Sequence, residues 1–243
     1  FEPERGDFLL ESVEGGAVRG RYSLLGLAPD LVFRANGEQA EINRHWLADR
    51  AAFEPLAETA LPALRSLVAS CRIDVPQGLP SALACLVGYF AYETIGLVEK
   101  LPRPAPNPLD LPDMLFVRPT LVLVFDRLSD QLFLVAPVWP ESSDPARQVE
   151  LAIDRIEAAS SRLALPLPAQ GKRTDLETLP PPEPVLAPGR YAQMVLKAKE
   201  YIAAGDIFQV VLAQRFTQPF PLPPFDLYRA LRRINPSPFL YHL

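Results

Sequence analysis

Histidine and cysteine are scarce in this chain, and their scarcity excludes several classes of site. The 243 residues contain 2 histidines, His45 and His242. His45 lies in a polar stretch typical of an exposed surface residue, so we expect neither a histidine-based catalytic triad nor a histidine-rich metal site. Cys71 and Cys85 are too few for a disulfide framework and match no metal-ligand spacing. We interpret them as reduced core thiols of a cytosolic protein.

Strong net charge and long apolar runs are also lacking. With 24 basic against 29 acidic residues the net charge is -5, which gives no electrostatic footprint for nucleic acid or an anionic membrane. No apolar run approaches the roughly 18 residues needed to span a bilayer. No signal peptide is visible, yet the chain opens with Phe1 and closes on the apolar segment 239–241. We therefore expect that the sequence is cut at both ends.

Proline is abundant, with 28 residues in 243, more than twice the usual share of about 5%. The hydrophobic fraction of 49% is ample for a packed core. Residues 164–188 are rich in proline and show no periodicity, so we interpret them as a linker. This divides the chain into regions 1–163 and 189–243.

Alternating apolar patterns predict strands in the first two thirds of the chain. Asn36-Gly37 joins two such runs and predicts a type I′ hairpin turn, because both residue types tolerate positive φ. A second hairpin is expected around residues 126–130. The predicted strands are 21–26, 31–35, 38–42, 121–125 and 131–135, and a later one is expected at 207–216.

Helical periodicity and capping residues predict four helices. Pro62 moves the expected start of the first helix, at about 55–70, nearer to Leu61. Asp144-Pro145 is an N-cap followed by proline at the first helical position, and Gly205 is a good residue to end a helix. The other three predicted helices are 145–163, 190–204 and 226–234.

Three stretches of the chain, taken in this order, carry a family resemblance. The first is Phe8-Leu-Leu-Glu-Ser12 with Arg21-Tyr-Ser-Leu-Leu-Gly26. The second is Ala204-Gly-Asp-Ile-Phe-Gln-Val-Val-Leu-Ala-Gln-Arg-Phe216, and the third is Asn235-Pro-Ser-Pro-Phe-Leu240. Together they resemble the chorismate-utilising enzymes, in the anthranilate synthase component I branch of that family, and residues 88–93 also look like the family. The resemblance implies an α+β fold: antiparallel β-sheets in a two-layer sandwich with helices packed outside, incomplete at the C-terminus.

The resemblance implies an enzymatic function for the whole parent protein, and it implies that this chain alone lacks the catalytic half. Members of the branch are cytoplasmic lyases that convert chorismate to anthranilate in tryptophan biosynthesis. They use Mg²⁺ and ammonia delivered by a glutamine amidotransferase, component II. Ammonia adds as a hydroxyl leaves, pyruvate is then eliminated, and L-tryptophan inhibits at a separate site. The chain matches roughly the N-terminal half of such an enzyme, with residues 189–243 as the start of its chorismate-binding region. The magnesium carboxylates, the chorismate clamp and the acid/base histidine are expected in the other half, so this fragment should be inactive alone.

The resemblance also implies a tryptophan pocket built from the first and third stretches. An amino-acid ligand needs acceptors for its ammonium group, which Glu11 could supply, and an apolar wall for its indole ring. Aromatic stacking adds about 0.5–1.5 kcal/mol beyond burial. Spacing alone favours the interpretation of these residues as a strand core, a turn and a helix end, and the family resemblance reverses this preference in favour of the pocket. The candidate tryptophan-binding residues are Glu11, Ser12, Pro238, Phe239, Leu240 and, more weakly, Tyr22.

Gln209 is the one candidate that bears on reaction type. It sits among apolar residues in the predicted strand 207–216, where a polar side chain must find hydrogen-bond partners. In relatives that add water to chorismate this position is a lysine, which can act as a general base. Glutamine cannot take a proton from water, whereas ammonia needs no such activation. A glutamine satisfied by backbone at a sheet edge is the alternative interpretation.

Two other functions remain open. The sister enzyme component I of aminodeoxychorismate synthase, in folate synthesis, adds the same amine but keeps the pyruvate group. A non-catalytic tryptophan-binding module is an alternative of a different class. Residues 208–212 and 235–240 favour the anthranilate branch.

Overall fold

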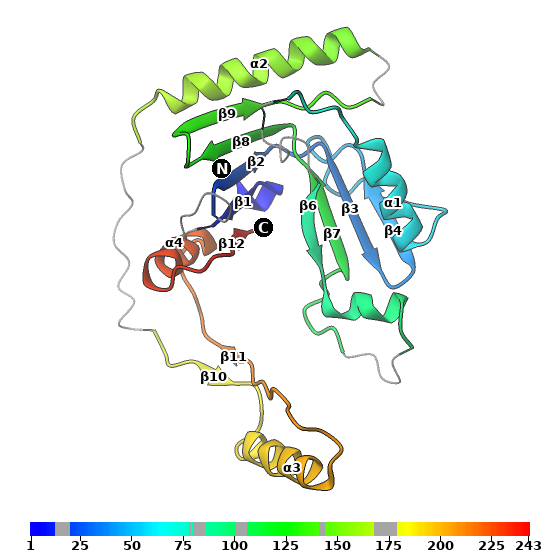
Figure 1. The fold of residues 1–243 in the computed structure, drawn as a ribbon, viewed down its shortest axis with the longest axis vertical. Coiled ribbons are helices and arrows are strands. Elements are labelled where there is room, and N and C mark those ends of the chain that lie inside the picture. Colours follow the sequence, from blue (N-terminus) through cyan, green and yellow to red (C-terminus); the bar gives the residue numbers. More distant parts are fainter. Residues whose placement is uncertain (13–19, 78, 80–85, 101–105, 141–143, 168–178) are drawn as a thin grey trace. The chain divides into compact units, whose positions relative to one another are not determined.

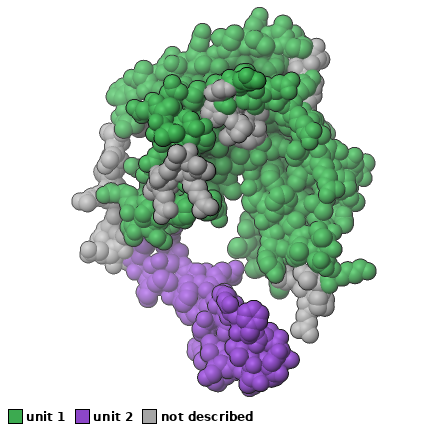
Figure 2. Space-filling view, viewed as in Figure 1, with its two compact units in different colours: residues 1–167, 228–243 green, residues 168–227 purple. Residues whose placement is uncertain are grey.

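The computed structural model describes residues 1–12, 20–77, 79, 86–100, 106–140, 144–167 and 179–243. The chain divides into two compact units (Figure 2). The first unit comprises Phe1–Leu167 together with Tyr228–Leu243, and the second comprises Pro168–Leu227. The C-terminal segment therefore returns to the first unit. The predicted linker 164–188 includes residues 168–178, which lie outside the described residues, and the predicted domain boundaries stay a prediction.

One antiparallel sheet of the first unit, called sheet A here, has the strand order β12-β1-β2-β8-β9. It joins the two ends of the chain, because Leu10 of β1 lies opposite Tyr241 of β12. The hairpin predicted around residues 126–130 is confirmed as β8 and β9, which pair from Asp126↔Gln131 onward. The strands are β1 (Phe8–Glu11), β2 (Tyr22–Leu27), β8 (Leu121–Asp126), β9 (Gln131–Val135) and β12 (Leu240–His242).

The second sheet of this unit, sheet B, has the order β5-β4-β3-β7-β6 and is also antiparallel. The predicted hairpin at Asn36-Gly37 is confirmed, but its turn type is wrong. Asn36 pairs with Gln39, so Gly37 and Glu38 are the central residues. Only Gly37 has positive φ, which is the pattern of a type II′ turn. The strands are β3 (Leu31–Asn36), β4 (Gln39–Asn43), β5 (Glu54–Pro55), β6 (Val87–Phe90) and β7 (Met114–Arg118).

A cluster of buried side chains joins the two sheets. Phe8 of sheet A is 1% exposed and packs with Val32 and Val117 of sheet B. A Cβ atom on Gly26 would overlap the Phe8 ring, so glycine is required where the ring crosses β2. Burying a large apolar side chain of this kind stabilises the fold by about 1.5–3 kcal/mol. The predicted α+β class with antiparallel sheets is confirmed.

Helices cover the outer faces of the sheets (Figure 1). α1 (Ala60–Ser70) begins near Leu61, as predicted, and packs Leu64 and Leu67 against sheet B. α2 (Pro145–Leu163) begins after its predicted cap, since the Asp144 carboxylate accepts a hydrogen bond from the Arg147 backbone. α4 (Pro224–Ile234) lies beside β1 and β12. Single 3₁₀ segments span Pro3–Arg5 and Tyr92–Leu97.

The second unit contains α3 (Arg190–Ala204), β10 (Glu183–Pro184) and β11 (Phe216–Thr217). α3 ends at Gly205 in the left-handed conformation, as predicted. The strand predicted over 207–216 is wrong, because only its last residue is in a strand. Phe208 and Val211 are 94% and 84% exposed. A strand forms only where a neighbouring strand pairs with it, and among the described residues a strand, β10, pairs with this segment only at its end, where Phe216 lies opposite Pro184.

Candidate functional site

A cavity of about 750 Å³ opens at the edge of sheet A, within the usual range of about 300–1,000 Å³ for ligand sites. Its wall comes from β1, β2 and the segment that leads into β12. All six residues proposed from the sequence line it: Glu11, Ser12, Tyr22, Pro238, Phe239 and Leu240. Four further described residues also line it: Leu10, Gly20, Leu24 and Tyr241.

Strand pairing explains why these residues meet. Leu10 lies opposite both Leu24 of β2 and Tyr241 of β12, and paired residues of antiparallel strands point to the same face. Leu10 and Leu24 also pack against the cluster that joins the sheets. The cavity therefore has an apolar wall on the inner face of sheet A. Sequence reasoning missed Leu10, Leu24 and Tyr241, although strand alternation from Phe8 puts Leu10 on the core side.

The carboxylate of Glu11 is held by two side chains of α4. The Tyr228 hydroxyl donates a hydrogen bond to Glu11 Oε2 at 2.7 Å, and Arg232 Nε lies 2.9 Å from the same oxygen. Burial, and then the hydrogen bond to Glu11, raise the pKa of Tyr228 above its ordinary value. The sequence contained a signal for these partners, because residues 228 and 232 are four apart and share one helix face.

A partly buried ion pair lies beside Tyr22. Arg21 donates two hydrogen bonds to Asp126, at 2.9 and 2.6 Å, and the Asp126 side chain is 3% exposed. The Arg21 guanidinium holds the pKa of Asp126 well below its usual range. The same guanidinium lies 4.8 Å from the centre of the Tyr22 ring. The ion pair thus links the start of β2 to the end of β8, and Tyr22, the first residue of β2, lines the cavity.

The other edge of the cavity is open. Phe239 is 82% exposed and Tyr241 is 67% exposed. The backbone amide of Phe239 lies 3.4 Å from Ser237 Oγ, and the backbone carbonyl of Ser12 accepts a hydrogen bond from Arg127 at 3.0 Å. The aromatic rings are thus available to a ligand, while backbone contacts hold the segments that carry them.

Gln209 does not join this site. It is exposed, lies in irregular backbone of the second unit, and is not among the residues that line the cavity. Its expected place in an apolar strand is wrong for the reason given for 207–216. The free thiol of Cys71 is partly buried, while Cys85 lies outside the described residues.

The described residues offer no metal centre and no membrane helix. No group of three or more histidine, cysteine, aspartate or glutamate side chains there is arranged to hold a metal ion. Among the same residues, no helix is both long enough and apolar enough to span a bilayer. Mg²⁺ prefers several carboxylate and other oxygen ligands, and the described residues do not bring such a set together.

Comparison with known proteins identifies the family of this chain. The family of chorismate binding enzymes matches residues 7–243, so this chain belongs to that family. It is 45% identical over 235 residues to anthranilate synthase component 1 of Cereibacter sphaeroides, a match that covers 96% of this chain and 47% of that protein. The corresponding protein of Thermus thermophilus is 37% identical, over 97% of this chain and 47% of its own length.

A solved structure supports the same assignment. The crystal structure of anthranilate synthase component I from Streptococcus pneumoniae is similar with a TM-score of 0.72 and 25% sequence identity. The similarity covers 93% of this chain and 48% of that one. The chain thus spans about half the length of the relatives that it matches, and the resemblance inferred from its motifs is confirmed at the level of the family.

Proposed function

We propose that this chain is the N-terminal part of an anthranilate synthase component I. The whole enzyme would be a cytoplasmic lyase of tryptophan biosynthesis that makes anthranilate from chorismate and ammonia. Its partner would be the amidotransferase component II, and its Mg²⁺ ligands would lie outside this chain. The relatives' names and the two high identities support this proposal. The chain alone would not turn over chorismate.

The proposed role of the cavity is to bind L-tryptophan as a feedback inhibitor. The observation that carries this role is the pairing of Glu11 with Leu240, which brings the first and third motifs into one cavity. An indole ring suits the apolar wall of Leu10 and Leu24 and the exposed ring of Phe239. The ligand's ammonium group would be placed near Glu11, with the Ser12 hydroxyl as a second polar contact.

Calorimetric titration of L-tryptophan into this chain tests the proposal. We expect saturable binding that Ser12→Ala weakens about fivefold or more, the usual loss for a polar contact. Phe239→Ala should weaken it as well, and because that side chain is exposed its removal should leave folding intact. Ser160→Ala, at an exposed position of α2, is the matched control. A chain that unfolds cooperatively and binds no tryptophan would refute the regulatory role.

The sister activity is separated by product analysis on the full-length parent enzyme. With chorismate, ammonia and Mg²⁺, anthranilate with free pyruvate supports the proposal, and an aminated product that retains its pyruvate group identifies the folate enzyme. A chain that binds tryptophan, from a parent that leaves chorismate unchanged, would be the non-catalytic module.

Gln209 is proposed to favour ammonia over water as the nucleophile of the whole enzyme. A neutral amide cannot act as a base, so water near it stays a poor nucleophile, whereas ammonia carries its own lone pair. Gln209→Lys in the full-length parent should allow measurable water addition to chorismate. Gln218→Lys, in the same unit, is the control. Unchanged products from the Gln209 variant would contradict this role.

A further inference from the structure

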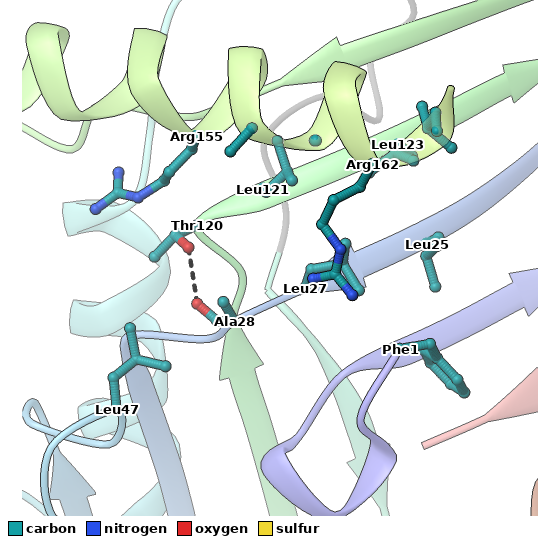
Figure 3. A pocket seen from close by; sticks show the side chains of 13 residues that line it. Phe1, Leu25, Leu27, Ala28, Leu47, Thr120, Leu121, Leu123, Arg155 and Arg162 are labelled. Carbon is teal, nitrogen blue, oxygen red and sulfur yellow. Dashed lines mark hydrogen bonds between the residues drawn. The ribbon is translucent and has the colours of Figure 1, made fainter. Parts of the chain in front are cut away.

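A second cavity, of about 400 Å³, lies between α2 and the outer face of sheet A (Figure 3). Its floor is made by leucines that alternate along β2 and β8, and its roof by two small residues of the helix. Alanine at these roof positions leaves space that a larger side chain would fill. The floor residues are Leu25, Leu27, Leu121 and Leu123, and the roof residues are Ala158 and Ala159.

Two arginines of α2 give this apolar cavity a positive edge. Arg155 and Arg162 are seven residues apart, so both lie on the same side of the helix and line the cavity. In Figure 3 Arg162 extends toward β2, and Arg155 extends to the left of Thr120. Neither forms an ion pair among the residues that the structure describes, and none of the residues lining the cavity is acidic. By contrast, Arg147 at the start of the same helix pairs with Glu150 at 2.8 Å.

The chemistry of the lining selects the ligand. A guanidinium group binds a carboxylate through two parallel hydrogen bonds, and the arginine stems add apolar surface to the leucine floor. A strongly hydrated sugar phosphate would lose its water against that floor without compensation. A zwitterionic amino acid would place its ammonium group beside two cations. We propose that this cavity binds a small monocarboxylate with an apolar body, about the size of one aromatic ring.

Benzoate is the probe, measured by calorimetry on the same 243-residue chain. We expect saturable binding with a dissociation constant of about 1 mM or tighter, and about tenfold weaker binding of the neutral analogue benzyl alcohol. One carboxylate binds one guanidinium group at a time, because the two arginines are about 10 Å apart along the helix. Either single substitution, Arg155→Gln or Arg162→Gln, should therefore weaken benzoate binding, and replacing both arginines by glutamine should weaken it about tenfold or more. Arg147→Gln, on the same helix, should leave it unchanged.

Two further variants separate this cavity from the tryptophan pocket and from poor folding. Ala159→Leu fills the roof, so it should abolish benzoate binding without lowering the melting temperature. Ser12→Ala should leave benzoate binding unchanged, whatever it does to tryptophan. Equal binding of benzoate and benzyl alcohol, or full binding to the double arginine variant, would overturn the proposal. A dimer in light scattering that Ala159→Leu dissociates, with no benzoate binding, would instead assign the groove to a second copy of the chain.

Discussion

The contact between Tyr228 and Glu11 gives a prediction that joins folding to the candidate site. Tyr228→Phe removes a single hydroxyl and keeps the ring, which is 8% exposed and lies edge-on to His242 with 5.7 Å between ring centres. The variant therefore deletes one hydrogen bond to a carboxylate and leaves the packing in place. It tests whether that bond fastens α4 to sheet A.

The size of the effect follows from the geometry. A hydrogen bond to a charged group contributes about 1.5–3 kcal/mol when both partners are buried. Glu11 is 14% exposed and keeps its ion pair with Arg232, whose side chain is 44% exposed. Water can therefore replace part of the lost bond, and we expect the lower end of that range, about 1.5 kcal/mol. For a chain of this length this corresponds to a fall in melting temperature of about 3–6 °C.

Thermal unfolding at neutral pH, followed by circular dichroism, measures this prediction. Tyr92→Phe is the matched control, because Tyr92 is 84% exposed, and it should change the melting temperature by less than about 1 °C. If the Tyr228→Phe variant has the same melting temperature as the unsubstituted chain, the hydroxyl does not stabilise the fold. The inference that Glu11 holds α4 against sheet A would then be wrong.

Three other substitutions test the frame around the site. Gly88→Ala should abolish the cooperative melt, since a Cβ atom there would overlap a backbone carbonyl of β7; soluble expression with an unchanged melt would contradict this. Asp126→Asn should lower stability at neutral pH. Arg21 depresses the pKa of Asp126, so the carboxylate contributes its full stability above its unfolded pKa of about 3.9. That contribution shrinks as pH falls toward the depressed folded-state pKa, so the difference between the two melting temperatures should be constant above about pH 5 and should decrease steadily below about pH 4. Asp144→Ala removes the cap of α2 and should cost about 1 kcal/mol in a urea titration, whereas Asp154→Ala, at an exposed position in the middle of that helix, should cost less.

Local patterns predicted most of the helices and hairpins. Asp144-Pro145 and Gly205 mark helix ends through contacts within a few residues, so no knowledge of the fold was needed to place them. The predicted turn type at Gly37 was wrong because the pairing register of the two strands decides which residues occupy the two central positions of the turn. That register depends on how both strands pack in the fold. The strand expected at 207–216 failed for a related reason. Its apolar pattern is suitable for a strand, but a strand also needs neighbours, and those come from elsewhere in the fold.

The site itself combines residues that no local pattern could bring together. Glu11 and Leu240 are opposite each other although most of the chain separates them. Family resemblance proposed both, while the physical signal in the sequence was only that each segment could form a strand. The alternation of side chains along a strand could have placed Leu10 and Leu24 on the core face of their strands. The partners of Glu11 on α4 required knowing that this helix returns to sheet A.

Strand alternation also limits how Glu11 can take part in ligand binding. Phe8 and Leu10 point to the core, so Glu11 belongs to the opposite face, where α4 meets it through Oε2. Within the described part of the chain, the hydrogen bond and the ion pair of Glu11 both involve Oε2, and Ser12 directly follows the end of β1. A ligand's ammonium group at Oε1 would interact with the same carboxylate as Arg232. The ligand and α4 would therefore both be attracted by the single negative charge of Glu11. Glu11 is therefore both a lining residue of the cavity and the partner of Tyr228 and Arg232 on α4.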